Sequence, residues 1–216
     1  MKKINITFLL DTKNNWILKY LNFNSFRKYK KYNFKIKNDY KSIKNQDIVF
    51  PMNYTKILPK KFLQRNNLIL VIHSSNLPQD RGFAPVSNQI LKGKNTIHFS
   101  LIKAEEKVDT GNVCFRSKIR LDGTELYDEL RKKQAFEFKK IINKFLKIYP
   151  NLKFKKQKGI SSFNVKRTPS DSELNVHKSL KSQFNLLRIC DNNKFPSFFY
   201  FKSQKYILKI FKDKKI

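Results

Sequence analysis

The sequence has very few cysteines, and their spacing argues against two common ways of stabilising a small protein. Only Cys114 and Cys190 occur among the 216 residues, and they lie far apart with no Cys-x-x-Cys pair. A disulfide framework needs more cysteines, and a structural zinc site needs closely spaced ligands. We therefore expect no disulfide framework and no metal site, and a fold suited to a reducing cytoplasm.

Long hydrophobic runs are also missing. The N-terminal apolar run stops at Asp11, which is too short for the hydrophobic part of a signal peptide followed by a cleavage site. No stretch approaches the roughly 18 apolar residues that a transmembrane helix requires. The sequence therefore predicts a cytoplasmic protein that neither spans nor binds a membrane.

Acidic residues are scarce, because 16 Asp and Glu stand against 47 Lys and Arg, for a formal net charge of +31. Such an excess fits a polyanionic partner: nucleic acid, a membrane surface or phosphorylated small molecules. The alternative is compositional drift, since the lysines accompany abundant Asn, Ile, Phe and Tyr, as in proteins from AT-rich genomes. The lysines are scattered and form no arginine-rich arm, which favours drift.

Glycine is rare as well, with five in the chain. No Gly-x-Gly-x-x-Gly sequence and no P-loop occurs. The segment 4–14, where a dinucleotide-binding fold places its glycine-rich turn, contains no glycine at all. This absence argues against a nicotinamide cofactor.

Short apolar runs with strand character alternate with helical patterns through the first part of the chain. Strands are expected at 4–10, 32–38, 47–52, 68–74, 95–104 and 112–121. Helices are expected at 14–23, 57–65, 86–93 and 124–149. The alternation predicts an α/β fold, Rossmann-like, with a mostly parallel central sheet.

The character of the sequence changes after Pro150, where a polar, loop-like segment begins. We expect residues 1–150 to form the main domain and 151–216 a small C-terminal extension. The extension would hold a helix over 177–189 and an aromatic hairpin over 195–211. This hairpin is either a homodimer interface or a small satellite core.

His73 ends the strand predicted over 68–74. Open α/β sheets bind their ligands beyond the carboxyl ends of their strands, and a histidine there is a candidate general acid or base. Asp109 lies in the turn before the strand 112–121, and we expect it to orient His73 and stabilise the charged ring. A purely structural histidine is the alternative. Ser74 and Ser75 do not suggest a serine hydrolase, because no Gly-x-Ser-x-Gly elbow occurs.

The segments VIHSSNLPQDRGFAP, LKGKNTIHFSLIKAEEKVDTGNV and DGTELYDEL resemble the formyltransferase fold of 10-formyltetrahydrofolate-dependent enzymes. These include methionyl-tRNA formyltransferases and sugar N-formyltransferases. The family loop is approximately His-x-Ser-Leu-Leu-Pro-x-x-Arg-Gly-x-x-Pro. The residues that keep this pattern are His73, Ser75, Leu77, Pro78, Arg81, Gly82 and Pro85. Upstream, a Tyr-x-x-Ile-Leu-Pro pattern is matched by Tyr54, Ile57, Leu58 and Pro59.

The resemblance implies roles for these residues. His73 would manage protons and stabilise the tetrahedral adduct, and Asp109 would orient and charge it. The co-substrate would be 10-formyltetrahydrofolate, with no metal. Its pterin slot would be lined by Tyr54, Ile57, Leu58, Pro59, Ala104, Glu105 and Val108. The loop that faces the acceptor substrate would include Ser75, Pro78, Arg81 and Gly82.

One position departs from the family pattern. The family usually has an asparagine two residues before the histidine, where it donates to the oxyanion, and this chain has Val71 there. Three explanations are open: Asn76 or a loop serine substitutes, cationic His73 suffices alone at a lower rate, or activity has been lost. Asn76 is the preferred substitute, because it is polar where the family loop is apolar.

The acceptor is less determined than the donor. A methionyl-tRNA formyltransferase usually carries a β-barrel after its catalytic domain, for which this chain has no room, so the resemblance favours an amino sugar. It would be a small molecule, nucleotide-linked or from a nonulosonate pathway, used for surface polysaccharide. The alternatives are a tRNA acceptor, which the charge of +31 could support, and a non-catalytic relative that only binds folate or sugar.

Overall fold

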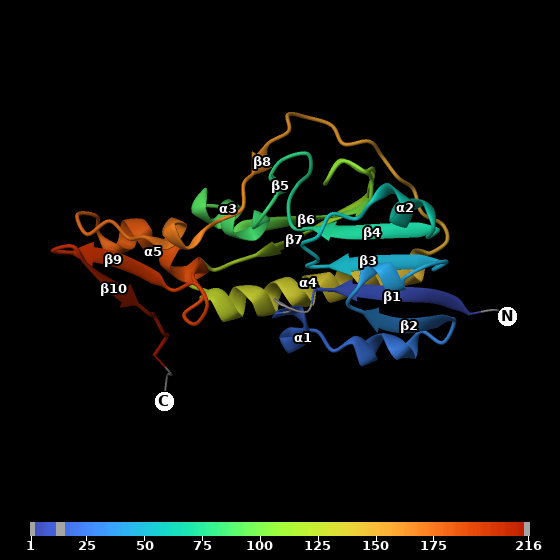
Figure 1. Ribbon diagram of the computed structural model, residues 1–216, viewed down its shortest axis with the longest axis horizontal. Helices are drawn as coiled ribbons and strands as arrows, with labels where there is room; N and C mark the ends of the chain where they lie inside the picture. The colour runs from blue at the N-terminus through green and yellow to red at the C-terminus, as the bar shows by residue number, and fades with distance from the viewer. Residues whose placement is uncertain (1–2, 12–15, 214–216) are drawn as a thin grey trace.

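A six-stranded sheet in the order β2-β1-β3-β4-β6-β7 forms the centre of a computed structural model that describes residues 3–11 and 16–213 (Figure 1). The strands are β1 (Ile4–Leu10), β2 (Tyr32–Lys37), β3 (Ile48–Met52), β4 (Leu68–His73), β6 (Thr96–Lys103) and β7 (Val113–Arg120). The first four in the sheet order run parallel, whereas β6 and β7 are antiparallel to their neighbours. The predicted α/β fold with a mostly parallel sheet is confirmed.

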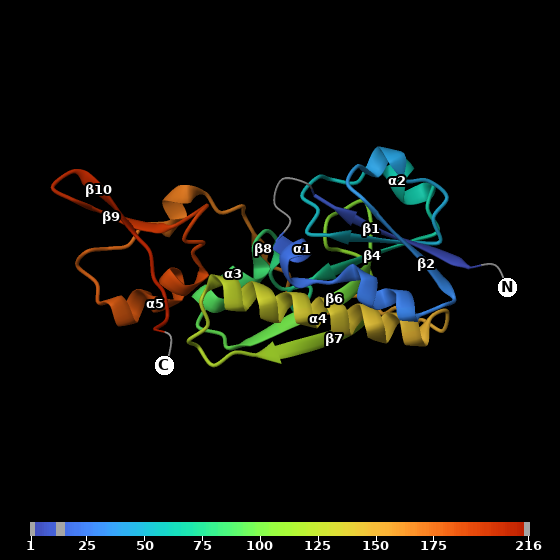
Figure 2. The same ribbon diagram turned by 90° about the horizontal axis from the view of Figure 1, so that it is seen from below.

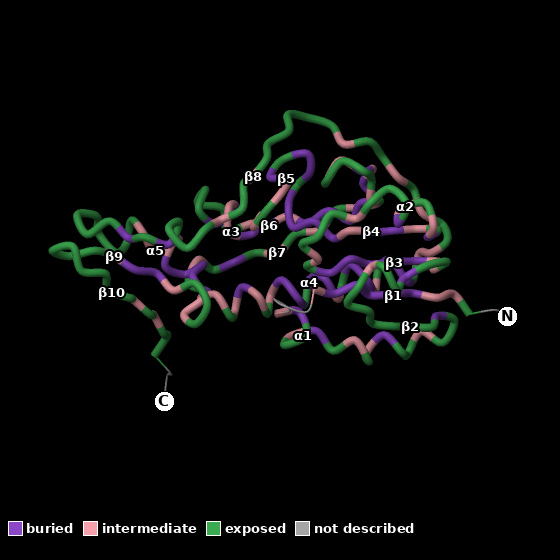
Figure 3. The backbone as a smooth tube through the Cα atoms, viewed as in Figure 1, coloured by how far each residue is buried: buried purple, intermediate pink, exposed green. Residues whose placement is uncertain are grey.

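The inner strands are apolar because both of their faces are covered, as parallel strands usually are. All five residues of β3 and the last five of β1 are buried. Phe8 lies at the centre of this core and contacts the rings of Phe23, Phe34 and Phe50. Buried residues are therefore concentrated in the middle strands of the sheet (Figure 3).

The helices predicted from the sequence are present but shorter. They are α1 (Trp16–Tyr20), α2 (Lys60–Gln64), α3 (Pro85–Leu91), α4 (Tyr127–Ile148) and α5 (Leu180–Ile189). Residues 14–15 of the first predicted helix lie outside the described part of the chain. Three short 3-10 helices were not predicted: η1 (Phe23–Lys28), η2 (Tyr40–Ser42) and η3 (Pro169–Ser172). No helix among the described residues is long and apolar enough to cross a bilayer.

Helix α4 lies along the sheet and α1 lies against its N-terminal half (Figure 2). Its buried face carries the predicted apolar stripe, from Leu130 through Phe138 to Phe145. Two polar side chains, Gln134 and Glu137, are buried in the same face. A packing role alone does not explain a buried amide there.

The segment after Pro150 returns to the main domain and forms a separate two-stranded sheet with it. Two residues of it, β8 (Phe163–Asn164), pair in parallel with β5 (Arg81–Gly82). The chain then reaches α5 and the hairpin of β9 (Ser197–Phe201) and β10 (Gln204–Leu208), at the end of the molecule far from the N-terminus (Figure 1). Two-residue strands have no periodicity, so the sequence could not predict the pairing of β5 with β8.

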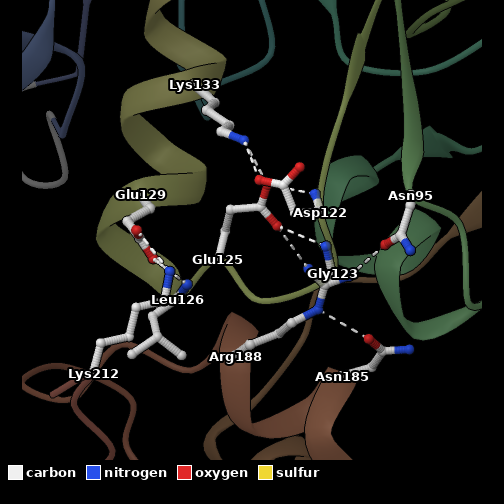
Figure 4. A network of polar contacts seen from close by, with 10 residues as sticks. All are labelled: Asn95, Asp122, Gly123, Glu125, Leu126, Glu129, Lys133, Asn185, Arg188 and Lys212. Atoms are coloured by element: carbon white, nitrogen blue, oxygen red, sulfur yellow. Dashed lines mark hydrogen bonds and ion pairs between the residues drawn. The ribbon is translucent and has the colours of Figure 1, made fainter. Parts of the chain in front are cut away.

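Glu125 connects the extension to the main sheet through a buried polar network (Figure 4). Its carboxylate accepts hydrogen bonds from the backbone N–H of Asp122 and from Lys133 Nζ, at 2.8 and 2.6 Å. Arg188 of α5, which is 1% exposed, lies 3.4 Å from the other oxygen and donates to Asn95 Oδ1 at 3.0 Å. Helix α5 is thereby fixed to the start of α4 and of β6.

Neutralising Glu125 is expected to destabilise the fold above pH 4.5. Burial raises the pKa of this carboxyl, but the hydrogen bond from Lys133 and the backbone N–H donors outweigh burial and lower it from 4.5 to about 2. The carboxylate therefore stabilises the fold above pH 4.5, and this contribution is lost as the pH falls toward 2. The shift corresponds to about 3 kcal/mol. Urea denaturation of Glu125→Gln should show this loss at pH 7 and a smaller one at pH 3.

The exposed Glu173 provides the control for this measurement. Glu173→Gln should change the free energy of unfolding by less than about 0.5 kcal/mol at both pH values. Equal losses at pH 7 and pH 3 in Glu125→Gln would contradict the charge-based explanation.

Candidate active site

His73 is the last residue of β4 and is 7% exposed. Its Nδ1 lies 3.3 Å from Oδ1 of Asp109, and its Nε2 lies 2.8 Å from the backbone carbonyl oxygen of Asp80. A carbonyl oxygen only accepts hydrogen bonds, so Nε2 carries a proton. Asp109 faces the other ring nitrogen, so the two contacts together orient the ring.

Asp109 projects from the turn that joins β6 to β7, with its backbone in the left-handed region at φ 57°. Its second oxygen accepts a hydrogen bond from the backbone N–H of Gly82 at 2.9 Å. Burial raises the pKa of the carboxyl, but the hydrogen bond and charge of His73, together with the Gly82 N–H, outweigh burial and lower the pKa overall. Asp109 is therefore ionised at neutral pH and can hold the charge of His73.

Glycine is required two residues further on. A Cβ at Gly111 would lie 1.6 Å from the carbonyl oxygen of Lys103. No side chain fits in that space, so the turn can close onto β6 only with glycine at this position. The Asp-Thr-Gly sequence thereby places the carboxylate beside the end of β4.

The loop after His73 is held by its own polar groups. Ser75 Oγ donates to the Gln79 carbonyl at 2.6 Å, and Arg116 donates to the Leu77 carbonyl at 2.8 Å. Ser75 and Pro78 are buried in the loop and do not line the cavity described below. Of the four residues predicted to face the acceptor, only Gly82 lines this cavity.

Gln157, in the segment after α4, contacts both the turn of Asp109 and the loop after His73. No pattern in the sequence indicated this residue. Its Nε2 donates to the carbonyl oxygens of Asp109 and Gly111, at 2.8 Å each. Its Oε1 accepts a hydrogen bond from Arg81 Nη2 at 2.7 Å. The side chain thus ties the turn of Asp109 to the loop of His73. Gln157 stands in a polar stretch without periodicity, so no sequence signal distinguished it.

A cavity of about 540 Å³ opens beside His73 and Asp109. Six of the seven residues predicted for the pterin slot line it: Tyr54, Ile57, Leu58, Ala104, Glu105 and Val108. Pro59 does not, because it is the N-terminal capping residue of α2. The structure therefore brings the predicted slot and the predicted catalytic pair together in one cavity.

Part of the lining of this cavity comes from α1 and α4, whose residues the sequence did not indicate. Trp16, Arg131, Gln134 and Phe138 line it, together with Ser74. Gln134 Nε2 donates to Ser74 Oγ at 3.0 Å, which joins α4 to the residue after His73. The apolar spacing of α4 is typical of a packing helix and gives no indication that its polar residues line a cavity.

Asn76 is not part of this cavity. It is exposed and lines a separate cavity of about 310 Å³ with Gln79, Gln89 and His98. The loop places it in a different cavity from His73, so the cavity lining does not support the prediction that Asn76 replaces the missing asparagine. Val71, in contrast, lines the same cavity as His73. The position of the family asparagine is therefore apolar here.

Comparison with known proteins agrees with this geometry. A family model described as formyl transferase matches residues 7–146, which run from within β1 through β7 to the first twenty residues of α4. A methionyl-tRNA formyltransferase from Finegoldia magna is 28% identical over 177 residues, which cover 77% of this chain and 54% of that protein. The chain spans about half the length of such curated relatives.

Solved structures show the same fold along nearly the whole chain. A methionyl-tRNA formyltransferase from Clostridium thermocellum superposes with a TM-score of 0.79 at 21% identity, covering 98% of this chain and 94% of that chain. A sugar N-formyltransferase from a Shewanella species superposes with a TM-score of 0.70 at 15% identity, covering 99% of both chains. At these identities the likeness establishes the fold and leaves the acceptor open.

Proposed function

Because this chain belongs to the formyl transferase family, we propose that it transfers a formyl group from 10-formyltetrahydrofolate to the amino group of a nucleotide-linked amino sugar. The observation that carries this proposal is the buried ion pair of His73 and Asp109 at the wall of a cavity with an apolar slot. A protein of the same fold, HypX from Aquifex aeolicus, was crystallised with tetrahydrofolic acid (TM-score 0.69, 16% identity). That structure supports folate as the carrier of the formyl group.

In the proposed reaction His73 acts first as a cationic donor, with Nε2 facing the Asp80 carbonyl and Nδ1 facing Asp109. The formyl donor supplies the carbon that the acceptor amine attacks, and negative charge develops on the formyl oxygen. His73 turns its Nε2–H from the Asp80 carbonyl toward this oxygen, while Asp109 holds the charge of the ring. Preorganised donors of this kind contribute about 3 kcal/mol to oxyanion stabilisation.

His73 then moves the proton that the reaction must transfer. It gives a proton to N10 of the folate as the carbon–nitrogen bond breaks, and it takes one from the nitrogen of the former amine. The net result is one proton moved from the acceptor amine to N10, with His73 restored as a cation. Asp109 stays ionised throughout, as its lowered pKa requires.

The amino-sugar acceptor is supported by the match to a sugar N-formyltransferase along the whole of both chains. A tRNA acceptor is the second candidate, since curated relatives are mostly methionyl-tRNA formyltransferases and the chain carries a charge of +31. Assaying formyl transfer to a panel of nucleotide-linked amino sugars and to methionyl-tRNA distinguishes the two. Turnover of methionyl-tRNA alone would refute the sugar proposal.

Placing a charge in the predicted pterin slot is expected to weaken folate binding at least tenfold. Val108 is 47% exposed and lines the slot, so Val108→Asp should fold normally yet force a carboxylate against the ring system. Calorimetric titration with 5-formyltetrahydrofolate measures the effect. The matched control is Val176→Asp, since Val176 is 50% exposed and lies outside the cavity. Equal affinity of the two variants for 5-formyltetrahydrofolate would show that folate does not bind in this slot.

A further inference from the structure

We propose that Arg131 binds a phosphate group of the acceptor substrate at the α4 wall of the cavity. This inference rests on the proposed function and deepens it, because it assigns the phosphate of the acceptor to the part of the cavity that α4 lines. Arg131 lines the same cavity as His73. The acceptor class that fits is one whose amino-bearing ring is joined directly to a phosphate, as in a nucleotide-linked amino sugar.

The guanidinium of Arg131 is held in place by two aromatic rings. Its central carbon lies 4.9 Å from the ring centre of Trp16 and 4.9 Å from that of Tyr127. Such stacking orients a guanidinium while leaving its edge available for hydrogen bonds. Trp16 belongs to α1, which lies against the N-terminal half of α4 (Figure 2). The contact between these helices therefore sets the position of the charge.

Arg131 has spare donors and no counter-ion within the described part of the chain. Its Nη1 donates to Gln134 Oε1 at 2.9 Å, but its buried Nε has no acceptor among the described residues. The ion pairs of the described chain include none to Arg131, and the undescribed residues 12–15 contain no carboxylate. Asp128, one turn earlier on α4, is bonded to Lys19 and to the Tyr20 hydroxyl. A stacked guanidinium without a carboxylate favours a bound anion.

The arginine is connected to the reaction centre by short links. Gln134, which accepts from Arg131, donates to Ser74 Oγ at 3.0 Å, and Ser74 directly follows His73. A phosphate on Arg131 would therefore keep an attached sugar ring beside His73. The proposed folate slot belongs to the same cavity, where Tyr54 and Val108 line it. The amine and the formyl carbon would therefore meet within one cavity.

A substitution that removes the charge tests the proposal. Titrations with dTDP, with UDP and with inorganic pyrophosphate are compared for the wild type, Arg131→Gln, Arg131→Lys and the control Arg27→Gln, in which an exposed arginine of η1 loses the same charge. Arg131→Gln should weaken nucleotide binding at least tenfold, Arg131→Lys should restore it only in part, and Arg27→Gln should leave it unchanged. Binding of 5-formyltetrahydrofolate should stay within twofold in all of them.

The outcomes separate this inference from the proposed function. Nucleotide affinity that is unchanged in Arg131→Gln, or a wild type that binds 5-formyltetrahydrofolate but none of the phosphate probes, overturns the phosphate site and leaves the folate reaction intact. A wild type that does not bind 5-formyltetrahydrofolate refutes the proposed function itself. Arg131-dependent binding of a methionyl-tRNA acceptor minihelix without nucleotide binding would overturn the sugar-nucleotide source.

Discussion

Asp109→Asn is expected to lower the rate constant of formyl transfer by about 100-fold to 10,000-fold, the range that positioned proton transfer contributes. The amide keeps the shape of the carboxylate but removes the charge that faces His73 Nδ1 at 3.3 Å. The carboxylate has two oxygens, one facing His73 and one accepting from the Gly82 N–H, whereas the amide has only one oxygen. The NH2 group of the amide then faces one of these two N–H groups, so the His73 ring loses both its orientation and its charge partner.

The measurement is a single-turnover assay with saturating acceptor, together with the affinity for 5-formyltetrahydrofolate. Because the pKa of Asp109 lies below its ordinary 3.8, the substitution removes a full charge at neutral pH. Asp213→Asn, on an exposed residue near the C-terminal end of the described chain, is the matched control. A single-turnover rate within threefold of the wild type, with folate affinity unchanged, would contradict the assignment of Asp109.

Much of this site could be predicted from the sequence, because the elements that carry it are local and strongly patterned. A buried strand ending in His73 and a hairpin turn containing Asp109 follow from apolar periodicity and from the position of Gly111. The slot residues 54–58 also follow a short pattern. Proximity of such segments in an open α/β sheet is a general consequence of its topology.

The missed residues act through contacts that no local pattern encodes. Gln157 lies in an irregular segment and reaches Asp109 from 48 residues away. Arg131 and Gln134 stand on a helix whose apolar stripe suggested packing alone, although the same helix also lines the cavity. Asn76 shows the converse: nearness in sequence to His73 does not determine which cavity a loop residue lines. Side-chain partners between distant segments therefore required the three-dimensional structure.

Val71→Asn is expected to raise the rate constant of formyl transfer about tenfold or more. Val71 precedes His73 by two residues on β4, so both side chains lie on the same face of the strand, and both line the cavity. An amide there would add a hydrogen-bond donor toward the developing oxyanion. Removing one such donor from other enzymes typically lowers the rate about 100-fold to 1,000-fold. In the proposed mechanism His73 is the donor to the oxyanion, so a second donor should lower the barrier further.

The same substitution should lower the stability of the fold, since Val71 contacts the apolar cluster of Leu77, Ile102 and Val113. A polar residue at this half-buried position should lower the free energy of unfolding by about 1 to 2 kcal/mol. The control is Val71→Asp, because aspartate has nearly the same size as asparagine but its carboxylate only accepts hydrogen bonds. This variant should therefore react more slowly than the wild type. If Val71→Asn folds, binds folate and reacts no faster than the wild type, an existing donor already meets the oxyanion.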